Sequence, residues 1–417
     1  MLHQSNICRS LFLFVAFMTC AAEAQNGGSA YSRYGIGDIR YFTASRTLGM
    51  GGESFALLSA NTIDDVNPAL WARIARTQFS ASVLYEGFSA SDDRKSGYYS
   101  NASFDGFMLA VPIVPRSGIV FAAGITPLSR INYNILLSDS LYNIHYLGDG
   151  GVSQGMIGFS AAPAGDLTLG AKLNYYFGTL RHSIYQSFPA GTSTNTQLVR
   201  STRVNGIGGS FGAVYGGLRN LFGIPESQSL NIGAVFATGS NLTAAEERYF
   251  TYATSTLNTQ DTLVSQDGTI RLPFAVGGGV AFATERYALT AGFYYQNWNS
   301  FADNGVGSPD LRDSYRINIG GELIPKRDAT LSFFNRLAYT AGFFYDATYY
   351  TIKDQPINEV GISGGLGIPM FSDTHLHLGV EYGFRGTTDQ NLQKDKILRV
   401  SMTLNVSELW FVRPPEE

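Results

Sequence analysis

The sequence predicts an all-β protein: a membrane-spanning antiparallel β-barrel of 14 strands with an N-terminal hatch or plug before the first strand. Three observations predict it. Many segments alternate between apolar residues and polar or small ones, the gaps between them alternate between short and long, and the chain opens with an export signal. Alternation with period two indicates strands, and in a membrane barrel one face of each strand meets hydrocarbon.

The first 24 residues have the features of a cleaved signal peptide. A weakly basic stretch ends at Arg9, an apolar run covers residues 11–18, and Ala22-Glu23-Ala24 forms an A-x-A cleavage site. The apolar run is too short for a membrane helix, which needs about 20 apolar residues. We therefore expect the mature chain to begin at Gln25 and to contain no membrane helix.

Both cysteines, Cys8 and Cys20, lie in the segment to be removed. We therefore expect no disulfide, no cysteine-based metal site and no thiol nucleophile in the mature chain. Lipidation at Cys20 is an alternative, but residues 17–19 form a poor lipobox. The formal net charge of −4 provides no basic field for a nucleic-acid partner. The 47 Gly, 24 Tyr and 28 Phe suit a barrel that has lipid outside and a polar lumen inside.

Fourteen segments carry the alternating pattern. In the range 376–384, for example, each second residue is apolar and the residues between are His, Gly or Glu. Aromatic pairs near strand ends, such as Tyr175-Tyr176 and Phe343-Phe344, fit interfacial girdles. The predicted strands are 77–88, 103–112, 117–127, 152–162, 167–180, 207–219, 229–238, 273–283, 287–298, 314–324, 335–347, 360–369, 373–385 and 397–411.

The connections distinguish a barrel from a soluble β-sandwich, whose strands also alternate. Short gaps hold turn formers such as Pro115-Arg116 and Ser372-Asp373, and they alternate with long gaps such as 128–151, 181–206 and 239–272. Short periplasmic turns, longer extracellular loops and an even strand number are typical of outer-membrane barrels. We therefore expect a protein of the outer membrane of a Gram-negative cell, with a barrel over residues 77–411 and a tail over 412–417. Both termini are expected on the periplasmic side.

Residues 25–76 lack this alternation. Gly49, Gly51 and Gly52 suit tight turns, and Asn67 is a good N-cap before Pro68, an ideal first helical residue. A short helix is thus expected from Pro68 toward Ala75. The residues alone leave two options for this segment, a periplasmic appendage or a plug inside the barrel. The candidate hatch or gating residues are Gly49, Gly51, Gly52, Asn67, Pro68 and Ala69.

The start of the chain resembles a known family. The glycine-rich stretch, the acidic pair Asp64-Asp65, Asn67-Pro68-Ala69 and a first strand after Thr77 resemble the FadL and TodX type of long-chain fatty acid transporter. The opening block with Arg385-Gly386-Thr387, Asn391-Leu392 and Trp410-Phe411 further resembles a branch of it common in Bacteroidota. The resemblance implies that the N-terminal segment is a hatch containing Asn-Pro-Ala and that the barrel has fourteen strands.

Charged residues on the predicted lumen face form the second candidate site. They either form a salt-bridge network that holds the hatch to the wall or contact a ligand directly. His375 and His377 share a strand face, and we expect rim residues rather than a metal site. No nucleophile motif of the Gly-x-Ser-x-Gly type supports an enzyme here, so neither enzymatic activity nor a cofactor is expected. The lumen residues are Lys172, Arg316, Glu322, Glu381, Arg385 and Arg399.

Two functions follow from these features. The first is passive uptake of small hydrophobic compounds such as long-chain fatty acids, gated by the plug and driven by apolar burial worth about 25 cal/mol per Å². The alternative is a non-transporting barrel that serves as an accessory or scaffold subunit of a larger outer-membrane assembly. The expected partners are outer-membrane lipids with a hydrophobic ligand or an outer-membrane protein complex. A continuous apolar path favours uptake, and a filled lumen with apolar surface outside the membrane band favours the scaffold.

Overall fold

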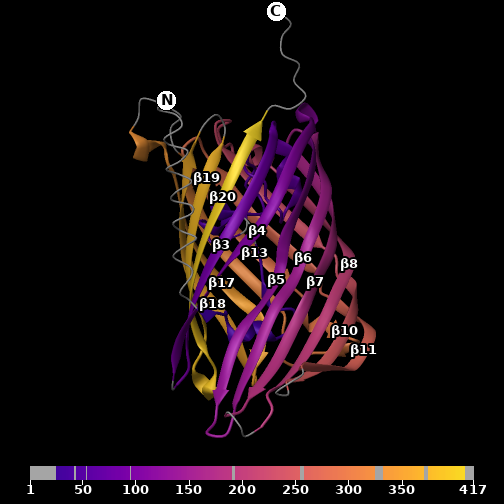
Figure 1. Ribbon diagram of the computed structural model, residues 1–417. Coiled ribbons are helices and arrows are strands. Elements are labelled where there is room, and N and C mark those ends of the chain that lie inside the picture. Colours follow the sequence, from indigo (N-terminus) through magenta and orange to yellow (C-terminus); the bar gives the residue numbers. More distant parts are fainter. Residues whose placement is uncertain are drawn as a thin grey trace, which may run out of the picture.

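The computed structural model describes residues 25–41, 44–52, 54–93, 95–189, 193–253, 258–324, 332–370 and 374–408 (Figure 1). Over these residues the strands form one closed antiparallel wall with 14 positions, as the sequence predicts. The closing pair is β20 with β3, whose register runs from Lys394 opposite Ser91 to Glu408 opposite Thr77. Among the described residues, no helix has the length and apolar character needed to cross a membrane.

Each wall position corresponds to one predicted segment. Two positions consist of two strands in line, because short breaks at 238–239 and 273–274 interrupt them. In wall order the strands are β3 (Thr77–Ser91), β4 (Ser96–Val114), β5 (Ile119–Ser138), β6 (Asn143–Ala164), β7 (Leu167–Ser187), β8 (Thr196–Tyr215), β9 (Ser229–Ala237) with β10 (Ser240–Ala253), β12 (Ala275–Ala283) with β11 (Asn258–Leu272), β13 (Tyr287–Gln296), β16 (Ser314–Leu323), β17 (Ala338–Ile352), β18 (Gln355–Pro369), β19 (His375–Gly386) and β20 (Lys394–Glu408).

The alternation in sequence becomes an apolar outer face and a packed inner face. On β6, Ile157 is 53% exposed and its neighbour Met156 only 3%. Successive strand residues point to opposite faces, so the exposed apolar set faces lipid. The same geometry corrects the expectation for aromatic pairs: Phe343 faces outward, whereas Phe344 is fully buried on the lumen side. In the pair Tyr175-Tyr176, likewise, only Tyr175 faces outward.

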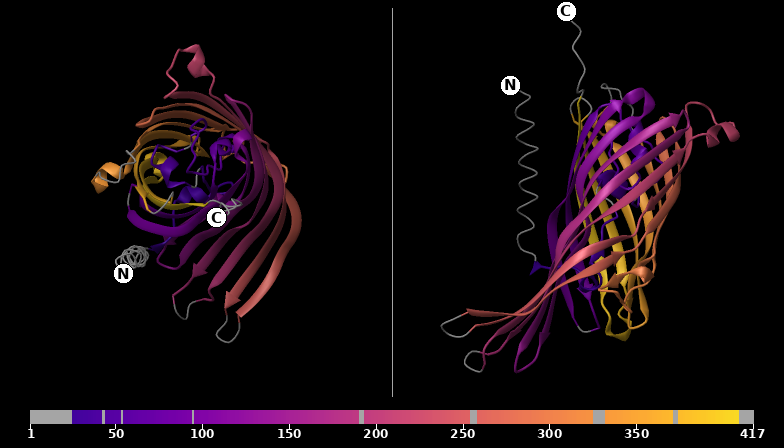
Figure 2. Two further views of the ribbon diagram at one scale, coloured as in Figure 1. Left: turned by 90° about the horizontal axis from the view of Figure 1, so that it is seen from above. Right: turned by 90° about the vertical axis from the view of Figure 1, so that its right-hand side faces the viewer.

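The longest gaps were expected to be loops, and that expectation is wrong. Strands β5 and β6 continue to Ser138 and from Asn143, so the gap 128–151 is mostly a hairpin. The gaps 181–206 and 239–272 likewise hold extensions of β7 and β8 and the hairpin β10–β11. These hairpins pair side by side and lean away from the barrel axis (Figure 2). Their backbone groups are satisfied by the neighbouring hairpin, which an exposed loop could not provide.

Most of the described N-terminal segment, residues 25–76, packs inside the ring of strands, and the view along the barrel shows it in indigo (Figure 2). The short helix predicted after Asn67 is present as a 3-10 helix, η3. The small elements of the segment are β1 (Gln25–Asn26), η2 (Ala30–Arg33), β2 (Asp38–Ile39), α2 (Ser45–Leu48) and η3 (Pro68–Arg73). Those between the wall strands are η4 (Pro115–Ser117), α3 (Leu218–Leu221), η5 (Trp298–Ser300), β14 (Ala302–Asp303), β15 (Val306–Gly307), η6 (Phe333–Arg336) and η7 (Asp389–Asn391).

The two ends of the described chain lie toward opposite ends of the barrel, which differs from the expectation that both termini share one side. Strand β20 ends at Glu408 beside Thr77, at the end with the short turns. Gln25 and Asn26 instead pair in parallel with Tyr99 and Ser100, in the half of β4 toward the long hairpins. The segment therefore enters the barrel through its wall.

Candidate functional site in the barrel lumen

Wall glycines let the backbone of the N-terminal segment lie directly against the strands. Gly320 and Gly342 are paired neighbours on β16 and β17. A Cβ on Gly320 would lie 2.1 Å from the carbonyl oxygen of Met50, and one on Gly342 would lie 2.2 Å from the amide nitrogen of Gly51. No side chain fits at these distances. Glycine at both wall positions thus permits backbone-to-backbone packing.

The predicted glycine cluster Gly49, Gly51 and Gly52 lies at this contact. Gly51 and Gly52 have φ angles of +84° and +124°, which glycine adopts readily. The amide of Gly51 donates to Ser363 Oγ at 2.8 Å, and its carbonyl accepts from Arg316 Nη2 at 3.1 Å. A Cβ on Gly49 would also meet a wall side chain at 2.2 Å. The cluster is hydrogen-bonded to two wall strands, β16 and β18, and therefore anchors the segment.

Asn67, Pro68 and Ala69 make a second contact with the wall. The fully buried Asn67 accepts from the amide of Ala69 at 3.0 Å through Oδ1 and donates to the carbonyl of Phe55 at 2.6 Å through Nδ2. A Cβ on Gly212 of β8 would lie 1.9 Å from Asn67 Oδ1. The side chain therefore caps η3, ties it to the chain around Phe55 and fits against a wall position that admits only glycine.

Charged side chains form further links between the N-terminal segment and the wall. Arg46 Nη2 lies 2.5 Å from Glu322 Oε2, and Arg385 Nη1 lies 2.9 Å from Asp38 Oδ1. All four side chains are at least four-fifths buried, so solvent screens these pairs little. These links include Arg46 with Glu322, Asp38 with Arg385, Arg40 with Glu86, and Lys172 Nζ donating to the carbonyl of Asp65.

Arg399 is the centre of the charge network on the wall itself. Its guanidinium lies 2.6 Å from Glu359 and 3.1 Å from Glu86, and it also pairs with Glu381. Glu381 is fully buried and lies 3.4 Å from Arg316 as well. Five charges from β3, β16, β18, β19 and β20 are therefore joined across the lumen side of the wall.

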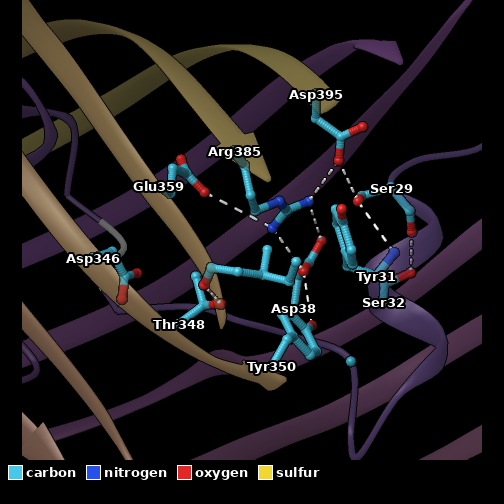
Figure 3. Close-up of polar contacts among 12 residues, drawn as sticks. Ser29, Tyr31, Ser32, Asp38, Asp346, Thr348, Tyr350, Glu359, Arg385 and Asp395 are labelled. Atoms are coloured by element: carbon cyan, nitrogen blue, oxygen red, sulfur yellow. Dashed lines mark hydrogen bonds and ion pairs between the residues drawn. The ribbon is translucent and has the colours of Figure 1, made fainter. Parts of the chain in front are cut away.

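Arg385 extends this network to the N-terminal segment (Figure 3). Its guanidinium lies between Glu359 at 3.8 Å, Asp395 at 3.5 Å and Asp38 at 2.9 Å. Asp395 also accepts a hydrogen bond from the hydroxyl of Ser29. Removal of one partner from such a buried network leaves an uncompensated charge and costs about 3–5 kcal/mol. The network is therefore suited to holding the N-terminal segment against the barrel wall.

The sequence-predicted lumen residues fall into three places. Arg316, Glu381, Arg385 and Arg399 meet in one network, whereas Lys172 and Glu322 hold the segment at separate contacts. Sequence reasoning missed several members. The missed strand residues occupy the alternate positions that face the lumen, so the period-two pattern could have revealed them. The irregular N-terminal segment has no such pattern, so its residues could not be found in this way. The missed members are Glu86, Asp346, Glu359 and Asp395 on strands, and Asp38 and Arg40 in the N-terminal segment.

The acidic pair Asp64-Asp65 lies on the N-terminal segment. Burial, and after it the charge of Asp65, raises the pKa of Asp64 to about 7. Burial also raises the pKa of Asp65, against the nearby positive charge of Lys172. The Asp64 carboxylate accepts from the amide of Val66 at 2.9 Å. Asp64 therefore exchanges its proton near neutral pH, and the stability of this segment depends on pH in that range.

Two of the cavities beside the described part of the N-terminal segment are small. One of about 50 Å³ lies against Asp38, Arg316 and Arg399, and another of about 90 Å³ lies between Ile36 and Trp298. Small-molecule sites usually measure about 300–1,000 Å³. These two cavities have room for a few water molecules, each of which takes about 30 Å³ in the liquid.

The N-terminal segment also fills a gap in the wall. Strands β4 and β5 pair only between the short turn and Phe107 opposite Ile125. Beyond that point β1 pairs with β4 and β2 pairs with β5. Between them, the amide of Asn132 donates to Ser32 Oγ at 3.1 Å. The chain's own residues therefore close the opening between these two strands.

Comparison with known proteins identifies the family to which this chain belongs. The BamG family matches residues 6–414, nearly the whole chain. This chain belongs to the BamG family. A comparison with curated proteins finds no match for it.

Solved structures show the same fold at low identity. The toluene transporter TbuX of Ralstonia pickettii is 15% identical over 88% of this chain and 98% of its own, with a TM-score of 0.59. A FadL homologue of Pseudomonas aeruginosa is 13% identical over 88% and 98%, with a TM-score of 0.57. The toluene transporter TodX of Pseudomonas putida is 14% identical over 89% and 99%, also with a TM-score of 0.57. The BamG chain is thus an outer-membrane β-barrel with a FadL-like fold, as the resemblance in sequence implied.

Proposed function

We propose that this BamG chain is a non-transporting accessory subunit of the BAM complex in the outer membrane. Membership of the BamG family supports a place in that assembly. The proposal includes export with cleavage after Ala24, short turns in the periplasm and long hairpins on the cell surface. Its barrel then serves as a rigid scaffold, and the N-terminal segment serves as a fixed plug.

The filled lumen is the observation that carries the proposal. Backbone contacts at Gly320 and Gly342, the buried Asn67 and the ion pairs hold the plug against the wall around most of the ring. The cavities of about 50 and 90 Å³ are too small for a fatty acid. These features support the scaffold function, because uptake needs a path that the packed plug occupies.

Passive uptake of a hydrophobic compound is the second candidate, favoured by the fold shared with toluene transporters. It requires the plug to move. Movement would separate at least the buried pairs Arg46–Glu322 and Asp38–Arg385. Uptake would therefore require a trigger that compensates these charges once the plug has left the wall.

Affinity purification tests the proposal. The chain carries a tag in its native host, the outer membrane is solubilised in a mild detergent, and the eluted proteins are quantified by mass spectrometry. We expect BAM subunits in near-equal amounts with the chain. A tagged barrel of unrelated function serves as the control. Recovery of the chain alone, together with uptake of toluene or oleate by liposomes that contain it, would reject the scaffold function and support transport.

A further inference from the structure

Two short elements project sideways from the short-turn end of the barrel. Figure 2 shows α3 and η6 as small helical turns outside the ring of strands, in pink and orange. Helix α3 lies between β8 and β9, and η6 precedes β17. We refer to residues 216–228 and 332–337 as the two rim projections. The strands β9, β12, β13 and β16 separate them along the wall.

Each rim projection carries a pair of large apolar side chains that the protein itself does not cover. Leu221 and Phe222 are 76% and 65% exposed, and Phe333 and Phe334 are 50% and 70% exposed. Adjacent apolar side chains with this exposure indicate contact with a membrane or a protein partner.

Both rim projections lie against tyrosines on the outer face of the wall. Tyr215 ends β8 and is 46% exposed, and its hydroxyl lies 2.2 Å from the position of a Cβ on Gly217, where α3 begins. Tyr339 is 38% exposed, and its hydroxyl donates to the carbonyl of Phe334 at 2.9 Å. Outward-facing tyrosines at strand ends mark the boundary between hydrocarbon and headgroups. The projections therefore lie at the level of that boundary.

Each apolar pair has an arginine beside it, Arg219 in α3 and Arg336 in η6. An arginine at such a boundary places its stem on apolar surface and its guanidinium among phosphates. The first projection is also held in place: the amide of Gly216 donates to the carbonyl of Asp166 at 2.7 Å. A fixed apolar group loses little conformational entropy when it enters lipid.

From this geometry we infer that the rim projections insert into the phospholipid leaflet at the short-turn end and anchor the barrel there. The occupant of both apolar pairs is lipid, because the surface is continuous with the lipid-facing side of β8 and β17 through Tyr215 and Tyr339. Two anchors on one side of the wall would fix the tilt and rotation of the barrel in the membrane. This inference is independent of the role proposed for the lumen.

Tryptophan quenching tests the inference. The full chain is placed in nanodiscs whose phospholipids carry bromine on the acyl chains, and the variants Phe222→Trp and Phe334→Trp are compared with the wild type. Of the three native tryptophans, Trp71 and Trp298 are buried, and subtraction of the wild-type signal removes the background of all three. Phe211→Trp, on the lipid-facing side of β8, provides the lipid reference, and Leu141→Trp, at the β5–β6 turn, the aqueous reference.

We expect the added fluorescence of Phe222→Trp and Phe334→Trp to be quenched at least half as strongly as that of Phe211→Trp. Quenching by acrylamide in water should then be several times weaker than for Leu141→Trp. Equal behaviour of the rim variants and Leu141→Trp would overturn the inference. Protection from both quenchers would also overturn it, since it would indicate burial against protein. Folding of each variant is checked by its heat-modifiable migration on a gel.

Discussion

Asn67→Ala should loosen the N-terminal segment without unfolding the barrel. The substitution removes the hydrogen bond from the Ala69 amide, and loss of a capping side chain costs about 1 kcal/mol. It also leaves the buried carbonyl of Phe55 without the donor now at 2.6 Å, which costs a further ~1–3 kcal/mol. The expected loss of local stability is therefore about 2–4 kcal/mol, or roughly a 30- to 1,000-fold increase in local opening.

Hydrogen exchange followed by mass spectrometry measures this change. Peptides from residues 45–76 should exchange faster by that factor, while peptides from β6 and β7 should keep their wild-type rates. Asn61→Ala, at a half-buried position of the same segment, is the matched control and should change exchange little. Exchange in Asn67→Ala that matches Asn61→Ala would refute the role of Asn67 as a structural lock. Faster exchange over the whole barrel would show a global effect instead.

Three further changes probe other contacts. Gly342→Ala places a Cβ 2.2 Å from the amide of Gly51, so we expect about 1–3 kcal/mol of strain and faster proteolysis near residues 45–52; unchanged cleavage would count against the close contact. Glu322→Gln leaves Arg46 buried without its counter-charge and should cost about 3–5 kcal/mol in the same assay, with recovery in Glu322→Asp excluding a purely steric cause. The pKa of Asp64 is raised to about 7, so the folded segment binds more protons than the unfolded one between pH 4 and 7, and its stability should fall as pH rises through that window. Asp64→Asn should flatten this pH dependence of hydrogen exchange, and an unaltered profile would assign it to another group.

The wall was predictable because its rule is local. Each strand needs only an alternating pattern and a turn, and both are present in the sequence around residues such as Ile157 and Pro115. The same rule failed in the long gaps. Residues 128–138 alternate as well, with Ile131, Tyr133 and Ile135 on one face, but the pattern of short and long gaps assigns them to a loop. Pairing with the neighbouring hairpin, a non-local effect, makes them strands.

The candidate site was only partly predictable for a related reason. Strand phase places Arg316 and Glu381 inside the barrel, but it does not say which charges meet. The partners Asp38 and Arg40 come from irregular chain, whose path depends on the wall around it. The glycines of the wall were visible in the sequence, yet their purpose appears only with the backbone of Met50 and Gly51 against them.

A covalent lock on the plug is the most direct test of the central claim. Ser45 Oγ of the plug lies 2.8 Å from Ser401 Oγ of β20, so Ser45→Cys with Ser401→Cys should form a disulfide. The expected mature chain has no other cysteine, and each single variant is a control. The measurement is whether the oxidised double variant restores the outer-membrane protein profile of cells that lack the chain. The scaffold account predicts full restoration; restoration only after reduction would mean that the plug must move and would contradict it.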